Sequence, residues 1–176
     1  MSAAQSSYVI ETIGIVGKLL RCNFWQQGAT FAHSMELVDG DASTTVLSSL
    51  ESQGEDLWPA TPPWQELHVH TQGNGEPALM LVGRAGSSHW SMSVIVDDSG
   101  TSLLFDVACR LRGTPDFLGG TYRLSGADCL VSVSPVVIDQ TAPATVKELD
   151  GNIVIDATSI AKAPATVRWA YRISLD

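Results

Sequence analysis

The middle of the chain carries serine, histidine and aspartate side chains, which are the residue types of a nucleophilic catalytic site. The candidates are Ser91 or Ser93 together with His89 and Asp106. In the β-hairpin that this segment predicts, His89 faces Arg110, which lies four residues beyond Asp106 on the same strand. At about 3.3 Å per residue, His89 and Asp106 are then roughly 13 Å apart. A histidine–carboxylate hydrogen bond spans about 2.6–3.2 Å, so we predict no catalytic triad.

Histidines also raise the question of a metal site. His68 and His70 place two imidazoles on one face of a predicted strand, but zinc needs three or four ligands at about 2.0–2.3 Å. In the predicted sheet, His89 lies roughly 16 Å from His68, and Glu66 lies about 13 Å from His70. The remaining histidine, His33, stands among apolar residues and is expected to be a hydrogen-bonded core residue. We therefore predict no metal site.

The three cysteines, Cys22, Cys109 and Cys129, are widely spaced and form no CxxC pair. An odd, sparse set of cysteines is unlike the disulfide framework of a secreted protein and favours a reducing compartment. Cys109 is predicted on an apolar sheet face, where a desolvated thiol is a poor nucleophile. The glycine patterns GxGxxG and the P-loop are absent. The sequence thus predicts no catalytic residue and no cofactor.

The strongest remaining feature is a row of basic side chains, Arg84, His89 and Arg110, predicted side by side on three neighbouring strands about 4.8 Å apart. Like charges placed in this way repel each other unless a negative group lies between them. One interpretation is a ligand-binding site for an anion or an acidic ligand. The favoured interpretation is structural: the arginines pair with the acidic segment 30–66 or with Asp106, Asp116 or Asp128.

Apolar and polar residues alternate with a period of two, which predicts the strands that position this row. Strands are expected near residues 19–25, 31–37, 44–51, 64–71, 78–85, 88–97, 101–112, 120–125, 129–138 and 166–175, with a further pair around Asp150-Gly151. No segment predicts an amphipathic helix, and no strand is assigned with clarity to the stretch from Tyr8 to Leu20. We predict one all-β domain over residues 1–176, a single antiparallel β-sandwich or flattened β-barrel of about ten strands with little helix.

The register of the central strands follows from a hairpin closed on Ser99-Gly100 and a tight turn at Gly86-Ser87. This register places only apolar residues on one face of the hairpin and leaves the other face mixed. Shifting it by one residue would mix the two faces. The side chains predicted to be buried on the apolar face are Leu81, Trp90, Met92, Val94, Phe105 and Cys109.

Composition limits the possible partners. Ten Lys and Arg residues against nineteen Asp and Glu residues give a formal net charge of −9, which argues against binding to nucleic acid or to anionic membranes. The N-terminus lacks the basic start of a secretory signal, and the apolar run from Tyr8 to Leu20 is too short and interrupted to span a membrane. We therefore expect an acidic cytoplasmic protein.

The face opposite the predicted core is mixed rather than polar. It carries an apolar patch made of Ala78, Met80, Val82, Ile95 and Leu104. Either another layer of the chain, such as the C-terminal strand, or a second copy must cover it, and a twofold homodimer is the commonest closed assembly. The leading hypothesis is a non-enzymatic binding or structural module that self-associates. The alternative is a small-anion binding protein or a small enzyme with its site at Arg84, His89 and Arg110.

Overall fold

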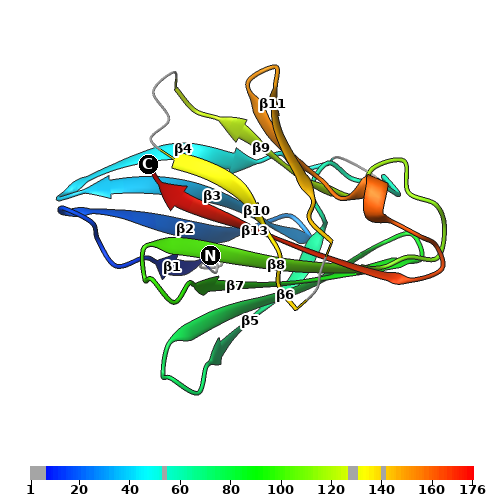
Figure 1. The fold of residues 1–176 in the computed structure, drawn as a ribbon, viewed down its shortest axis with the longest axis horizontal. Coiled ribbons are helices and arrows are strands. Elements are labelled where there is room, and N and C mark those ends of the chain that lie inside the picture. The colour runs from blue at the N-terminus through cyan, green and yellow to red at the C-terminus, as the bar shows by residue number, and fades with distance from the viewer. Residues whose placement is uncertain (1–6, 53–54, 127–130, 140–141) are drawn as a thin grey trace, which may run out of the picture.

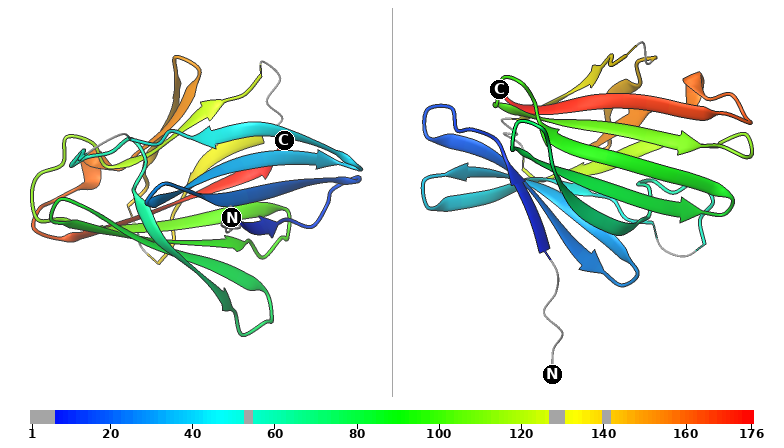
Figure 2. Two further views of the ribbon diagram at one scale, coloured as in Figure 1. Left: turned by 180° about the vertical axis from the view of Figure 1, so that it is seen from behind. Right: turned by 90° about the horizontal axis from the view of Figure 1, so that it is seen from below.

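The computed structural model describes residues 7–52, 55–126, 131–139 and 142–176. In this part of the chain there are thirteen strands and one 3-10 turn, Thr158–Ile160. The strands form two antiparallel sheets that face each other, and the right-hand view in Figure 2 separates the layer with β1–β4 from the layer with β6, β7, β8 and β13. The two sheets do not close into a barrel. Of the two predicted architectures, the sandwich is therefore the one observed.

The two sheets combine strands from distant parts of the sequence (Figure 1). The seven-stranded sheet has the order β1 (Ser7–Glu11), β2 (Lys18–Gln27), β3 (Thr30–Asp39), β4 (Ala42–Ser49), β9 (Gly119–Leu124), β12 (Asn152–Asp156) and β11 (Thr145–Leu149). The six-stranded sheet has the order β10 (Val131–Val136), β13 (Thr166–Leu175), β8 (Ser102–Arg110), β7 (Ser88–Val96), β6 (Pro77–Ala85) and β5 (Trp64–Thr71).

The two Asp-Gly turns lie at the positions that the sequence predicts. Gly40 and Gly151 adopt positive φ angles of 58° and 73°, which glycine reaches without steric cost and which suit tight hairpins. Both predicted Asp-Gly turns are thereby confirmed. One strand, β1, covers the start of the Tyr8–Leu20 stretch, to which the sequence assigns no strand with clarity. Its alternation is obscured because Val9, on the face opposite the buried Ile10, is apolar but largely exposed.

A single cluster of buried apolar residues fills the space between the sheets. The six side chains predicted for the core of the central hairpins all belong to it: Leu81, Trp90, Met92, Val94, Phe105 and Cys109. A chain of hydrogen bonds crosses this core, from His33 Nε2 to the Tyr122 hydroxyl at 2.9 Å and from there to the Tyr171 hydroxyl at 2.8 Å. The expectation that His33 is a hydrogen-bonded core histidine is confirmed.

The C-terminal strand does not cover the mixed face of the central strands. Instead, β13 pairs antiparallel with β8 and lies in the same sheet, so that Trp169 and Ile173 face the common core. The possibility that this strand forms a covering layer is therefore wrong. The strand predicted at residues 129–138 is observed as β10, and Cys129 lies outside the described residues.

Candidate functional site

The three basic residues of the predicted site are brought together as expected. Arg84 on β6 pairs with His89 on β7, and His89 pairs with Arg110 on β8. All three side chains are exposed. They lie on the face of the six-stranded sheet that points away from the core, which we call the outer face. The row is therefore on an open surface and not in an enclosed cavity.

The turn between β6 and β7 holds one end of the row in place. Gly86 has a positive φ of 54°, which lets the chain reverse within the two residues between Ala85 and Ser88. The Arg84 side chain folds back over this turn, and its Nε donates a hydrogen bond to the Gly86 carbonyl oxygen at 2.8 Å. This contact fixes the base of the guanidinium and leaves its two terminal nitrogens without a partner among the described residues.

The carboxylates expected to neutralise the row bind elsewhere or remain apart. Asp106 accepts hydrogen bonds from Nε and Nη2 of Arg168, at 2.8 and 2.5 Å, and Arg168 also lies 3.6 Å from Asp139. Within the described ranges, neither Arg84 nor Arg110 forms an ion pair, with Asp116 or any other carboxylate. The prediction that Arg84 and Arg110 form ion pairs with Asp106, Asp116 or the acidic segment is therefore wrong. The remaining predicted partner, Asp128, lies outside the described residues.

A shallow hollow of about 430 Å³ lies beside the row on the outer face. It occurs where side chains are short, since Ser91 and Ala108, which are cross-strand neighbours, are among the residues that line it. Arg84, His89 and Arg110 all line it, and so does Glu66, whose carboxylate lies 3.4 Å from His68. A small ligand resting on Ser91 would thus meet two guanidinium groups and an imidazole at the hollow's margin.

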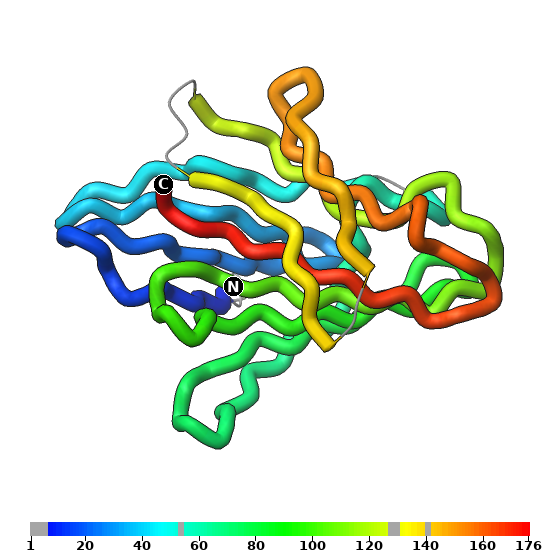
Figure 3. Tube along the Cα trace, in the orientation of Figure 1, coloured from blue at the N-terminus to red at the C-terminus, as the bar shows by residue number. Residues whose placement is uncertain are grey.

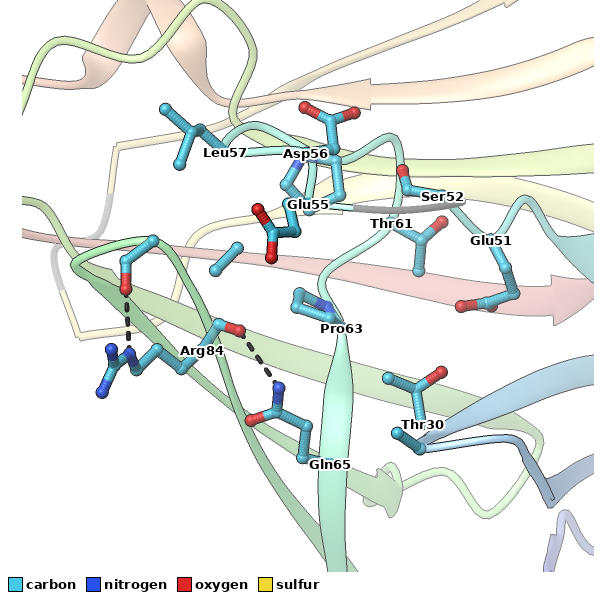
Figure 4. Close-up of a pocket in the computed structure, with 14 residues that line it drawn as sticks. Thr30, Glu51, Ser52, Glu55, Asp56, Leu57, Thr61, Pro63, Gln65 and Arg84 are labelled. Atoms are coloured by element: carbon cyan, nitrogen blue, oxygen red, sulfur yellow. Dashed lines mark hydrogen bonds between the residues drawn. The ribbon is translucent and has the colours of Figure 1, made fainter.

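A second hollow of about 500 Å³ lies on the other side of Arg84 and is acidic. Figure 4 shows Glu55 and Asp56 on its upper wall, while the Arg84 guanidinium extends away from them toward Gly86. Glu51 lines the same hollow, and partial burial raises the pKa of its carboxyl group, against the opposing effect of the hydrogen bond from Ser49. The acidic segment seen in the sequence is thus placed next to the basic row without neutralising it.

The other chemically active residue types are less favourably placed. Burial raises the pKa of the Cys109 thiol to about 12 and, with the nearby Glu36 carboxylate, that of Cys22 well above its usual range, so both thiols remain protonated and unreactive. His68 lies 3.4 Å from Glu66 on an exposed strand face. Across the described residues, no three His, Cys, Asp or Glu side chains are close enough together to hold a metal ion.

Two features of the site were not identified from the sequence. The sequence suggests Ser91 only as a candidate nucleophile. The predicted register nevertheless places it next to Ala108, where two small side chains leave space for a ligand. The acidic hollow has no sequence signal beyond the excess of acids, because it forms where the loop with Glu55 and Asp56 folds against the β6–β7 turn.

Comparisons with known proteins add no family to this description. No protein-family model matches the sequence, and no curated protein matches it. In the described part of the chain, no helix has the length and apolar character needed to cross a membrane. Function must therefore be argued from the outer face itself.

Proposed function

We propose that the chain is a non-enzymatic binding module that takes an anionic group at Arg84, His89 and Arg110. The observation that carries this proposal is the absence of any carboxylate partner for Arg84 and Arg110 among the described residues. Arg84 and Arg110 lie two strands apart on either side of His89, so an anion between them would gain charge-assisted hydrogen bonds without displacing an ion pair that the described residues form.

The chemistry of the row favours a carboxylate or phosphate group. Guanidinium donors match the oxygens of such groups, and their charge-assisted hydrogen bonds are stronger than neutral ones. The exposed Ser91 hydroxyl can donate a further hydrogen bond from the floor of the hollow. Glu55 and Asp56 would repel an anion on the far side of Arg84, and Glu66 on β5 also lines the hollow beside the row. A ligand position between Arg84 and Arg110, on the Arg110 side away from these carboxylates, is therefore favoured.

Binding rather than catalysis is proposed because the row lacks an activated group. Within the described residues, the His89 side chain contacts neither a carboxylate nor a hydroxyl that it could activate. General-base catalysis requires the base to lie within hydrogen-bond reach of the proton that it removes, with a third group to orient it. An exposed imidazole between two arginines suits recognition of negative charge better.

Replacing Arg110 with alanine should weaken anion binding by roughly tenfold or more, because a hydrogen bond to a charged group contributes about 1.5–3 kcal/mol. Isothermal titration calorimetry with inorganic phosphate and, separately, with citrate measures this loss and distinguishes phosphate from carboxylate recognition. The matched control is Arg123→Ala, since Arg123 is also exposed but belongs to β9 in the other sheet. No binding by the wild type, or equal losses for both variants, would contradict the proposal.

A second candidate function, self-association, is favoured by apolar side chains that remain exposed on the six-stranded sheet. On the outer face, Met80 and Val82 of the predicted patch are 42% and 43% exposed, and on the core-facing side Val69 of β5 is 56% exposed. Ile95 and Leu104, the other large members of the predicted patch, are only partly exposed. Exposure therefore increases toward the β5 end of the sheet, and a second copy of the chain would remove it from water.

The protein is expected to be a homodimer at tens of micromolar. Light scattering coupled to size-exclusion chromatography measures this at low and at high salt. Apolar burial should persist in high salt, whereas ion pairs at the rim should weaken, since exposed charges are screened beyond about 8–10 Å at physiological ionic strength. A monomer under both conditions would contradict self-association and would leave anion binding unaffected.

A further inference from the structure

The strand β5 forms an open end of the six-stranded sheet. Among the described residues it pairs only with β6, so the backbone N–H and C=O groups along its other side have no strand partner. Such an edge pairs readily with another strand unless it is short, or is blocked by proline, lysine or a bulge. From Glu66 to Thr71, β5 has a regular register and contains neither proline nor lysine.

The other three edge strands are less suited to pairing. β5 has eight residues, whereas β1 and β11 have five each and β10 has six. Pro135 interrupts the donors of β10, and Lys147 with Glu148 places charges along β11. The Glu11 carboxylate on β1 is held by Arg21. The structure thus leaves β5 as the longest unprotected edge in the described part of the chain.

The core-facing side of β5 also lacks a covering layer beyond Leu67. Leu67 and Val69 point to the same face of the sheet, but Leu67 is buried whereas Val69 is more than half exposed. Figures 1 and 3 show the reason: the β5–β6 hairpin extends past the rest of the sandwich at the bottom of the view. Val69 is therefore an apolar residue on a core-facing position that this copy of the chain does not cover.

We infer that β5 pairs antiparallel with β5 of a second copy around a twofold axis at His68. The segment Glu66-Leu67-His68-Val69-His70 is self-complementary in this register. Leu67 of each copy opposes Val69 of the other on the core-facing side. On the outer side Glu66 opposes His70, and the two His68 side chains face each other at the axis. Opposite residues in an antiparallel pair have Cβ atoms about 4.5–5.5 Å apart, close enough for both contacts.

Neighbouring registers are less favourable. An axis at Leu67 would pair Leu67 with itself and Glu66 with His68, but it would leave the exposed Val69 against Gln65, which forms the bulge at the start of β5. An axis at Val69 would set His68 against His70 and Leu67 against Thr71. Only the axis at His68 sets the exposed Val69 against an apolar residue and Glu66 against a histidine at once, and the twofold symmetry repeats both pairs.

This inference rests on the proposed self-association and names its interface. The first test is Val69→Lys, which should raise the dimer dissociation constant by at least roughly tenfold, because it places an unpaired charge in the apolar contact. The matched control is Val9→Lys on β1, since Val9 is 48% exposed at an edge of the other sheet; it should leave the dimer unchanged. Sedimentation equilibrium measures all dissociation constants, and circular dichroism establishes that each variant is folded.

The decisive test exchanges the charges of Glu66 and His70. Within one copy these residues are four apart on a strand, or roughly 13 Å, so they cannot compensate for each other there. Glu66→Lys and His70→Glu should each weaken the dimer, because each puts like or unmatched charges opposite one another. The double variant should restore the dimer. Loss of the Glu66–His68 contact within one copy is common to Glu66→Lys and the double variant, so it cannot account for a difference between them.

Each outcome has one meaning. A monomeric wild type would overturn both self-association and this interface. A dimer that tolerates Val69→Lys and shows no rescue in the charge exchange would overturn the β5 pairing alone. Loss of the dimer in Leu104→Lys, with Val69→Lys tolerated, would place the contact on the outer face instead. Loss of the dimer in Val69→Lys, together with its recovery in the double charge variant, establishes the β5 pairing. If Val69→Lys does not fold, recovery of the dimer in the double charge variant decides the question.

Discussion

Replacing Trp90 with alanine should lower the free energy of unfolding by about 3–5 kcal/mol, as large core truncations do. Trp90 is 3% exposed and lies between Gly83 and Cys109 on the neighbouring strands, with Trp58 edge-on at a ring distance of 6.3 Å. Gly83 cannot be replaced by a larger residue to fill the space, since a Cβ there would lie 1.9 Å from the Pro63 carbonyl oxygen. Urea unfolding followed by far-ultraviolet circular dichroism measures the loss.

The matched control for this prediction is Trp25→Ala. Trp25 lies on β2 in the other sheet and is only partly buried. The same truncation therefore removes less buried apolar surface and should lower the free energy of unfolding by less. A loss for Trp90→Ala no larger than that for Trp25→Ala would mean that Trp90 does not pack in the core as described. Because Trp90 also borders the hollow beside the basic row, anion binding should be measured at a temperature where the variant is folded.

The central strands could be predicted from the sequence because their pairing is local. Short turns join β6, β7 and β8, and side-chain direction alternates strictly along a strand, so one turn position determines every later pair. The row of Arg84, His89 and Arg110 followed from this rule alone. The cross-strand pair of Trp90 with Cys109 followed in the same way.

Contacts between distant segments could not be predicted by the same reasoning. Asp106 was expected to form an ion pair with Arg84 or Arg110. Instead, β13 pairs with β8 and brings Arg168 directly alongside Asp106. The exposure of Val69 depends on where the opposite sheet ends, which alternation along β5 does not encode. Alternation determines which face a residue occupies, whereas the pairing of distant strands determines what covers that face.

His33 should make the protein begin to lose stability in acid at a pH above the range in which carboxylates titrate. Burial lowers the pKa of His33 to about 3, whereas a histidine in the unfolded chain has a pKa near about 6.5. Above this value both states hold the neutral imidazole, and the full stability is present. As the pH falls from about 6.5 toward about 3, the unfolded chain binds a proton that the folded chain does not, which costs up to about 1.4 kcal/mol per pH unit.

The variant His33→Gln isolates this effect, because glutamine can still form a hydrogen bond with Tyr122 but gains no proton in this range. The variant starts from a lower stability, since His33 also stacks on Phe24 at a ring distance of 4.8 Å. Urea unfolding at a series of pH values from 7 to 4 should nevertheless give a steeper decline for the wild type than for His33→Gln. The acidic residues titrate in both proteins, so the difference between the two slopes belongs to His33. Parallel curves would mean that the folded protein protonates His33 as readily as the unfolded chain does. They would contradict the burial of His33 in the hydrogen-bonded group with Tyr122 and Tyr171.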